Sequence, residues 1–263
     1  MRRLIEVFSL LVIAISASAQ TVTSWDGKRV GFLGDSMTDP SNKAASHKYC
    51  AVLERDLGIK AQVFARSGFM WDKMLDKAVE LRDSLGDDVD AIFIFCGTND
   101  FNHNRPIGEF YSEATVETNV NGQMTPRRHR VWSQDPATLA GSMNRALFFL
   151  KSNYPDIPIF IMTPIHRGYA KFGDKNVQPD EDFANGLGLY IEDYVAEIKR
   201  GAMYWSIPVI DLYGESGILP NLRSNDVFIS NEETDRLHPS DAGHERIAKM
   251  LKLRLREWCE QTE

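Results

Sequence analysis

The sequence predicts an α/β fold, a three-layer αβα sandwich with a mainly parallel sheet of five strands at its centre. Short runs of β-branched and aromatic residues alternate along the chain with longer amphipathic segments, which is typical of a parallel sheet with helices on both faces. The 263 residues contain no internal repeat and no low-complexity linker. We therefore expect a single domain over residues 20–263.

The predicted strands are short and mostly apolar, and helical spacing of apolar residues follows each of them. In chain order the strands are expected over residues 30–34, 62–65, 90–96, 157–162 and 207–212. The helices are expected over residues 44–57, 71–85, 136–153, 186–205 and 241–258. Ser240 is the predicted N-cap of the last helix. His47 and His244 lie in helical patterns beside charged residues, and we expect both to be solvated.

Three connections are longer than the roughly two to six residues usual between such elements, over residues 98–135, 166–182 and 213–239. Each of them follows a predicted strand. In an open parallel sheet, ligands bind outside the carboxyl ends of the strands. The long connections therefore lie at the edge of the sheet where a functional site is expected.

The first nineteen residues have the pattern of a cleaved secretory signal peptide. Arg2 and Arg3 precede a mostly apolar run over residues 7–15, and Ala17-Ser18-Ala19 follows it. The run is shorter than the ~20 apolar residues of a membrane-spanning helix. An uncleaved anchor or a buried first helix is the alternative. We expect a secreted or periplasmic protein with no stable membrane insertion after cleavage.

The net charge of −7 argues against functions that need a positive surface, so neither nucleic acid nor an anionic membrane is expected as a partner. Cys50, Cys96 and Cys259 fall in strand or helix patterns, and we expect all three thiols to be free and buried. No C-x-x-C or H-E-x-x-H motif occurs, so the sequence gives no support for a metal site. We expect a reaction that needs neither a metal nor a cofactor.

Small and polar residues gather where predicted strands end and in the last long connection. Four such blocks occur in order along the chain: Gly34-Asp35-Ser36-Met37, Ser67-Gly68, Gly97-Thr98-Asn99-Asp100 and Asp235-Arg236-Leu237-His238-Pro239. A serine that directly follows a strand can present its hydroxyl and its own N–H to the same cavity. The shared position of the blocks at one edge of the sheet indicates a single site.

In these four blocks the chain resembles the SGNH hydrolases, also called the GDSL esterase/lipase family. The family's first block, usually Gly-Asp-Ser-Leu, matches residues 34–37, with Met37 as an apolar replacement for leucine. Gly68 matches the second block, residues 97–100 the third and residues 235–239 the last. The resemblance covers essentially the whole chain after the first nineteen residues. It implies the flavodoxin-like SGNH hydrolase fold and an ester hydrolase.

The residue types of these blocks suit acyl transfer to a serine. The hydroxyl of Ser36 needs a base to take its proton, and the imidazole of His238 titrates in the useful range. Asp235 could accept the other ring N–H and fix the tautomer. The resemblance implies an oxyanion hole made by the backbone N–H groups of Ser36 and Gly68 and the side-chain amide of Asn99. The predicted catalytic residues are therefore Ser36, Asp235 and His238.

Four further residues are weaker candidates for contacts with the substrate. His166 and Arg167 follow the fourth strand at the active edge. Trp71 could form a pocket wall or belong to the helix core, and Phe101 lies in the 98–135 connection. The amides and aromatic side chains of that connection suit a sugar, and they equally suit a surface lid.

Together these observations predict a secreted serine esterase that hydrolyses an oxygen ester through an acyl-Ser36 intermediate. The expected substrate is a small-molecule or glycan ester, and deacetylation of a carbohydrate is favoured because the chain is exported and acidic. A lysophospholipase or thioesterase is the near alternative. An acyltransferase to a sugar alcohol would use the same acyl-enzyme, and a glycan-binding protein without catalysis is the remaining alternative.

Overall fold

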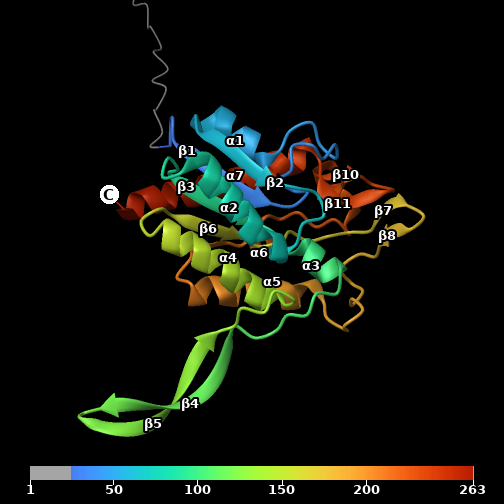
Figure 1. Cartoon of the computed structure of the whole chain (residues 1–263). Helices are drawn as coiled ribbons and strands as arrows, with labels where there is room; N and C mark the ends of the chain where they lie inside the picture. The colour runs from blue at the N-terminus through green and yellow to red at the C-terminus, as the bar shows by residue number, and fades with distance from the viewer. Residues whose placement is uncertain (1–24, 263) are drawn as a thin grey trace, which may run out of the picture.

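The computed structural model describes residues 25–262, with side chains for residues 25–256. The predicted signal peptide, residues 1–19, lies outside the described residues. Within the described range the chain forms three layers, with a parallel sheet between two sets of helices (Figure 1). The predicted α/β sandwich is therefore confirmed.

The central sheet has five parallel strands in the order β2-β1-β3-β6-β9. They are β1 (Arg29–Gly34), β2 (Lys60–Ala65), β3 (Ala91–Phe95), β6 (Ile159–Met162) and β9 (Val209–Ile210). Every residue of β3 and β6 is buried, because helices cover both faces of the sheet, and this explains their unbroken apolar sequences. The strand order changes direction between β1 and β3, and such a switch point opens a crevice at the carboxyl ends.

Two sets of helices complete the layers. One face of the sheet carries α1 (Tyr49–Leu57) and α7 (Asp241–Thr262), and the other carries α2 (Met74–Leu85), α4 (Leu139–Asn153) and α5 (Ile191–Tyr204) (Figure 1). Neighbouring residues of a strand point to opposite faces. Phe32 therefore belongs to the core on the side of α1 and α7, whereas Leu33 belongs to the core on the other side.

Two helices begin five residues later than the sequence pattern predicts. The first begins at Tyr49 and not at residue 44, because the carboxylate of Asp241 accepts hydrogen bonds from the N–H and the hydroxyl of Ser46 and holds a turn there. Helix α5 begins at Ile191 and not at residue 186. Here the side-chain oxygen of Asn185 accepts two backbone N–H groups and replaces the first helical turn.

A small antiparallel sheet is built from the second and third long connections, in the strand order β10-β11-β7-β8. Its strands are β7 (Ala170–Gly173), β8 (Asn176–Gln178), β10 (Ile229–Asn231) and β11 (Asp235–Pro239). Short helices in this part of the chain are α6 (Leu212–Glu215) and η2 (Arg223–Phe228). Because β7 pairs with β11, the hairpin of β7 and β8 lies beside the strand that carries Asp235 and His238.

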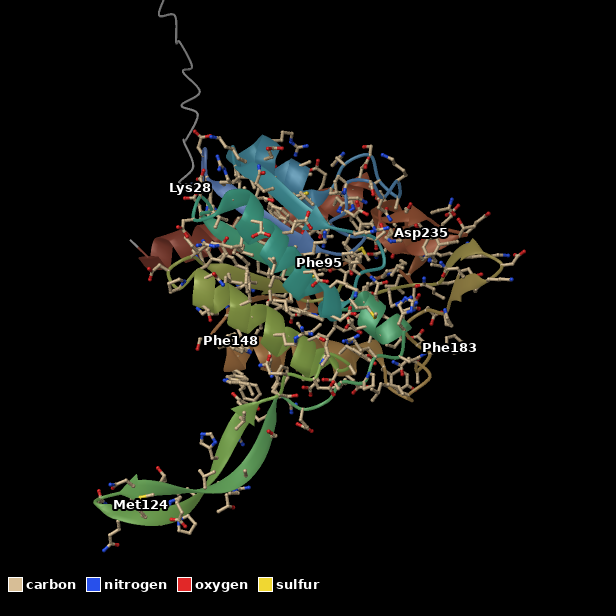
Figure 2. The ribbon with its side chains drawn as sticks, in the orientation of Figure 1. Lys28, Phe95, Met124, Phe148, Phe183 and Asp235 are labelled. Atoms are coloured by element: carbon tan, nitrogen blue, oxygen red, sulfur yellow. The ribbon has the colours of Figure 1, made fainter. Side chains whose placement is uncertain are left out.

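The first long connection, residues 98–135, contains a projecting hairpin. After the short helix α3 (Thr98–Asn102), strands β4 (Tyr111–Val120) and β5 (Gln123–Trp132) pair only with each other. Asn121 and Gly122 both have positive φ, as a two-residue hairpin turn requires. The hairpin extends away from the sandwich, with Met124 far from Asp235 (Figures 1 and 2). The expectation that this whole connection lies at the active edge is therefore wrong.

Burial of the cysteines agrees with the sequence prediction as far as the structure describes them. Cys50 and Cys96 are free and buried, and the side chain of Cys259 lies outside the described part. Burial raises the pKa of the Cys50 thiol to about 11. Among the helices within residues 25–262, none combines the length and the apolar character that crossing a bilayer would require.

His244 is buried, and its predicted exposure to solvent is wrong. Its ring stacks on Tyr49 with 6.3 Å between the ring centres, and neither ring nitrogen has a hydrogen-bond partner among the described residues. Burial lowers the pKa of His244 to about 3, so the ring is neutral at ordinary pH. His47 is partly exposed, with its ring near the carboxylates of Asp241 and Glu245.

Candidate active site

Ser36 lies in a tight turn that directly follows β1. The carbonyl oxygen of Asp35 accepts the N–H groups of Thr38 and Asp39, and the Asp35 carboxyl accepts the N–H of Met37 at 2.9 Å. A Cβ on Gly34 would lie 2.7 Å from the carbonyl oxygen of Phe95, so only glycine allows this close approach of β1 to β3. These contacts hold Ser36 at the carboxyl end of the sheet, where 5% of its surface is exposed.

His238 joins Ser36 to Asp235. Its Nε2 atom lies 2.9 Å from Ser36 Oγ, and its Nδ1 atom lies 2.9 Å from Asp235 Oδ2. The Asp235 carboxylate also accepts the backbone N–H of His238 at 3.0 Å. The carboxylate thus holds both the backbone and the ring of the histidine. All three side chains are buried, which shields their hydrogen bonds from competing water.

Unpaired N–H groups lie next to this chain of hydrogen bonds. Within the described residues, the backbone N–H groups of Ser36 and Gly68 donate to no partner. Gly68 has φ +84°, and a Cβ there would meet no protein atom within 4 Å, so the backbone conformation and not crowding favours glycine. The Asn99 side-chain nitrogen donates to the Phe69 carbonyl at 3.0 Å and, more weakly, to Asp35 Oδ2 at 3.3 Å.

Asp39 holds the segment that carries Gly68. One of its carboxylate oxygens accepts both the N–H and the hydroxyl of Ser67, at 2.8 and 2.9 Å. The other oxygen accepts the N–H and the hydroxyl of Ser41. Partial burial alone would raise the pKa of Asp39, but these hydrogen bonds outweigh it and lower the pKa. The charged carboxylate therefore ties the end of β2 to the turn after β1.

Two carboxyl groups lie buried beneath the site. Burial raises the pKa of Asp35 to about 7 and that of Asp100 to about 8. Asp100 accepts the backbone N–H of Trp71 and lies 3.5 Å from the Arg105 Nε atom. These two groups keep their protons at pH values where exposed carboxyl groups have already lost them.

A cleft of about 600 Å³ opens over Ser36 and His238, and Gly68 and Asn99 also line it. The structure thus brings together the residues that the four sequence blocks selected. The lining includes residues that the sequence analysis did not select, among them Asn42, Asn102, His103, Phe172, Lys175 and Asn176. Phe172, Lys175 and Asn176 belong to the hairpin of β7 and β8, and only their place in a long connection after a strand pointed to them.

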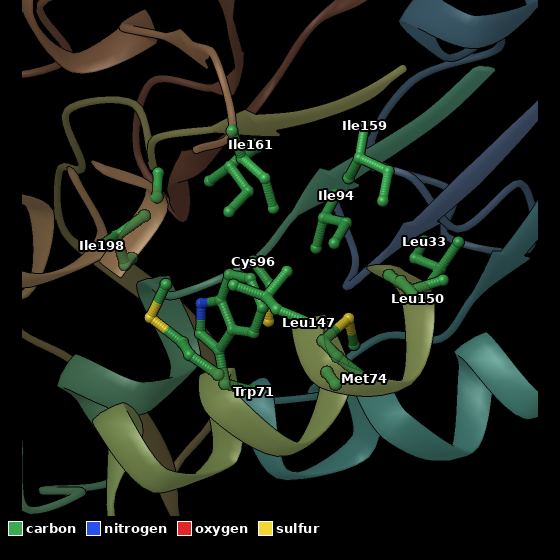
Figure 3. Close-up of a cluster of buried hydrophobic side chains, with 14 of the residues drawn as sticks. Leu33, Trp71, Met74, Ile94, Cys96, Leu147, Leu150, Ile159, Ile161 and Ile198 are labelled. Atoms are coloured by element: carbon green, nitrogen blue, oxygen red, sulfur yellow. The ribbon is translucent and has the colours of Figure 1, made fainter. Parts of the chain in front are cut away.

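Trp71 and Phe101 do not line this cleft. Trp71, which begins the short helix η1 (Trp71–Lys73), is fully buried in the core beside Cys96 and Leu147 (Figure 3). The prediction of a pocket wall is wrong for Trp71, because the chain after Gly68 turns the indole under α4. Phe101 is buried too and packs against the guanidinium of Arg167, 5.2 Å from its ring centre.

His166 and Arg167 lie behind the cleft and not on its surface. The His166 ring bonds to the Glu181 carboxylate at 2.6 Å and stacks on Tyr213. Arg167 is 1% exposed, and burial lowers its pKa to about 10. Its guanidinium donates to Gln178 Oε1 at 2.8 Å. Arg167 therefore reaches the cleft only through other side chains.

The family model described as "GDSL-like Lipase/Acylhydrolase family" matches residues 32–246. This range contains every residue of the site described above. A search of curated proteins finds no match.

Solved structures share the fold over most of the chain. A protein from Lactobacillus plantarum is 26% identical with a TM-score of 0.68, over 88% of this chain and 98% of that chain. The lipase/acylhydrolase from Enterococcus faecalis is 18% identical with a TM-score of 0.51, over 85% and 93%. A salicylyl-acyltransferase from a tetracycline biosynthetic pathway is 12% identical with a TM-score of 0.56, over 89% and 56%. At these low identities the last two similarities show the fold alone.

Proposed function

The chain belongs to the GDSL-like lipase/acylhydrolase family of ester hydrolases, and we propose that it hydrolyses an oxygen ester through an acyl intermediate on Ser36. One observation carries this proposal. The Nε2 atom of His238 lies 2.9 Å from Ser36 Oγ, with the unpaired N–H groups of Ser36 and Gly68 beside it. A base, a nucleophile and donors for an oxyanion thus meet at one point of the cleft.

In the proposed first step, His238 takes the proton of Ser36 as the hydroxyl oxygen attacks the ester carbonyl. Asp235 stabilises the imidazolium that forms. The carbonyl oxygen becomes an oxyanion, which the N–H groups of Ser36 and Gly68 and the amide of Asn99 stabilise. The weak hydrogen bond of Asn99 to Asp35, at 3.3 Å, is the one that the oxyanion would replace.

His238 then gives its proton to the leaving alcohol, and the acyl group stays on Ser36. A water molecule attacks the acyl-enzyme in the second step, with His238 again as the base. The same oxyanion donors serve both steps, because each passes through a tetrahedral intermediate at the same carbon.

The favoured reaction is deacetylation of a carbohydrate, and the cleft supports it. Amide side chains of Asn42, Asn102 and Asn176 line the cleft, whereas Phe172 and Leu237 are its only large apolar side chains among the described residues. Amides suit hydroxyl-rich sugars, and a long acyl chain would need a larger apolar surface. These residues come from the segment after β1, the start of the 98–135 connection, the β7–β8 hairpin and β11, whereas the β4–β5 hairpin of the 98–135 connection projects away from the cleft.

Replacement of the nucleophile tests the proposal. Ser36→Ala should lower kcat for p-nitrophenyl acetate by roughly 10³-fold or more, because within the described part of the chain Ser36 carries the only hydroxyl that is hydrogen-bonded to His238. Thermal unfolding of the variant should match the wild type. Unchanged activity in a correctly folded Ser36→Ala protein would exclude the acyl-Ser36 mechanism.

Substrate series separate the remaining alternatives. Loss of activity as the acyl chain of p-nitrophenyl esters lengthens favours a deacetylase, whereas a gain favours a lysophospholipase. A matched thioester tests the thioesterase alternative. Transfer of the acetyl group to an added sugar alcohol, measured by product analysis, would identify an acyltransferase.

We also propose that the protein is exported, on the strength of the signal-peptide pattern in residues 1–19. N-terminal sequencing of the protein from its natural host tests this. A mature chain that begins at Gln20 supports export to the periplasm or the medium, and an intact Met1 in the cytoplasm contradicts it.

A further inference from the structure

Among the described residues, no carboxylate side chain lines the cleft over Ser36, although the chain as a whole has 37 acidic and 30 basic residues. Nearby carboxylates have partners of their own. Asp235 is bound to His238, Asp39 to Ser67 and Ser41, and Glu181 to His166. Among the described residues, the lining of the cleft is therefore free of negative side chains, although the chain carries a net negative charge.

Lys175 supplies a positive charge to this cleft. It lies at the turn between β7 and β8 and lines the cleft. The adjacent carboxylate of Asp174 pairs with Lys171 at 3.0 Å, and no described carboxylate forms an ion pair with Lys175. The ammonium group is thus available to a ligand.

Arg167 fixes the orientation of two amides on the same wall. Its guanidinium donates to Gln178 Oε1 at 2.8 Å and to Asn102 Oδ1 at 3.4 Å. A guanidinium has only donors, so both amides must turn their oxygens toward Arg167 and keep their nitrogens away from it. The buried Arg167 thereby determines which atoms Asn102 and Gln178 offer.

Gln178 in turn orients the side-chain amide of Asn176. Gln178 Nε2 donates to Asn176 Oδ1 at 3.1 Å, so the oxygen of Asn176 is occupied and its nitrogen remains as a donor. The wall formed by Asn102, Lys175 and Asn176 therefore presents N–H donors and a positive charge. We call these three residues the donor wall.

Two residues of the donor wall, Lys175 and Asn176, belong to the β7–β8 hairpin, which adjoins His238. Phe172 of this hairpin packs against the His238 ring with 5.4 Å between the ring centres, and β7 pairs with β11. His238 is the group that protonates the leaving alcohol in the proposed reaction. Lys175 and Asn176 therefore lie toward the alcohol part of the ester.

We propose that the donor wall is a subsite for a negatively charged substituent, such as a carboxylate or a sulfate, on the alcohol part of the substrate. This subsite is distinct from the oxyanion hole. This inference rests on the proposed esterase function and specifies its substrate class as an anionic ester. N–H donors and an ammonium group stabilise such a group, and the absence of carboxylates in the cleft removes the repulsion that the acidic protein would otherwise exert.

Three substrates that differ only at C6 test this subsite. They are the same acetyl ester of methyl galactoside, of methyl galacturonide and of methyl galactoside 6-sulfate. The wild type should show a higher kcat/KM for the two anionic esters than for the neutral one, by about fivefold or more, and added salt should reduce this preference. Preference for the galacturonide alone would assign the wall to a carboxylate.

Variants link the preference to the donor wall. Lys175→Met should lower the anionic-to-neutral ratio of kcat/KM by about fivefold, and Asn176→Asp should lower it further because it adds a negative charge. Lys60→Met is the control, since it removes an exposed lysine at the start of β2 that does not line the cleft and leaves the pair of Lys171 and Asp174 intact. Its ratio should stay that of the wild type.

A wild-type anionic-to-neutral ratio of kcat/KM near one, or an equal ratio in Lys175→Met and Lys60→Met, would overturn the subsite while leaving the esterase intact. Binding to Ser36→Ala, followed by NMR titration with methyl galacturonide and methyl galactoside, separates the two proposals. Tighter binding of the galacturonide that Lys175→Met abolishes supports the subsite even if no ester is hydrolysed. Equal binding of both sugars contradicts it.

Discussion

Two hairpins lie in connections that begin at the same edge of the sheet, after β3 and β6, and only one of them reaches the site. The β7–β8 hairpin pairs with β11 and packs against His238. Four of its residues therefore line the cleft: Phe172, Lys175, Asn176 and Gln178. The β4–β5 hairpin pairs only with itself, and at its base Tyr111 and Trp132 pack near Tyr204 and Trp205.

The difference shows that a long connection after a strand is insufficient to form a site. A connection contributes when it pairs with an element that already carries reacting groups, as β7 does with β11. If this view is correct, the effects of substitutions should decline from the turn after β1 toward the tip of β4–β5.

At the sheet edge, Asn99→Ala should lower kcat by about 10²–10³-fold, as loss of other oxyanion donors does. KM for p-nitrophenyl acetate should change much less, because the amide acts mainly on the transition state. Steady-state kinetics measure both values. A rise in KM alone would show that Asn99 binds the ground state and would remove it from the oxyanion hole.

His244 lies in the interior behind the catalytic turn, and its substitution should affect stability. Its pKa is about 3 in the folded protein and near 6.5 when unfolded, so the unfolded chain binds more protons between these values. Stability from this group is therefore full above pH 6.5 and is lost as the pH falls toward 3, by about 2 kcal/mol between pH 8 and pH 5.

His244→Phe keeps an aromatic ring against Tyr49 and removes the titration. Urea unfolding at pH 8 and pH 5 should show a smaller loss of stability in the variant than in the wild type. Equal losses in the two proteins would mean that His244 is protonated in the folded state. The buried Asp35 and Asp100 remain in both proteins, so their opposite pH dependence cancels in this comparison.

Asp39 is a positioning residue at the rim of the cleft. Asp39→Ala should lower kcat by about tenfold, because Ser67 loses its anchor and Gly68 can move away from the oxyanion. Asp39→Asn, which keeps one acceptor oxygen, should recover part of the activity with KM near that of the wild type. A purely structural role would lower the melting temperature without this graded recovery of kcat.

Shortening the β4–β5 hairpin should have the smallest effect. Replacement of residues 113–130 by an Asn-Gly turn keeps the packed base, and kcat/KM for p-nitrophenyl acetate should stay within about twofold of the wild type. A larger loss would show that the projecting hairpin communicates with the cleft, and it would contradict the contrast between the two hairpins.

The sequence predicted the sheet and the edge at which the four blocks meet, because both depend on local patterns. Buried strands such as β3 are continuous apolar runs, and strand ends place Ser36 and Asn99 at one edge. The pairing of His238 with Ser36 follows from the family's blocks and not from periodicity.

Other features depend on tertiary packing and could not be predicted. Lys175 reaches the cleft only because β7 pairs with a strand distant in the chain. The burial of Trp71 and His244 depends on which side of a turn or helix faces the sheet. Charged residues next to them in the sequence suggest an exposed position, so the sequence pattern does not reveal this burial. The strands of β4–β5 lack a buried face, so they show no apolar alternation, and the Asn121-Gly122 turn was their clearest local signal.

The most direct test of the proposed mechanism is the site of covalent labelling. Reaction with a fluorophosphonate, followed by peptide mass spectrometry, should place one label on Ser36 and abolish ester hydrolysis, because the oxygen held by His238 is the nucleophile. His238→Ala should react far more slowly. Labelling of another residue, or full activity after complete modification of Ser36, would contradict the account.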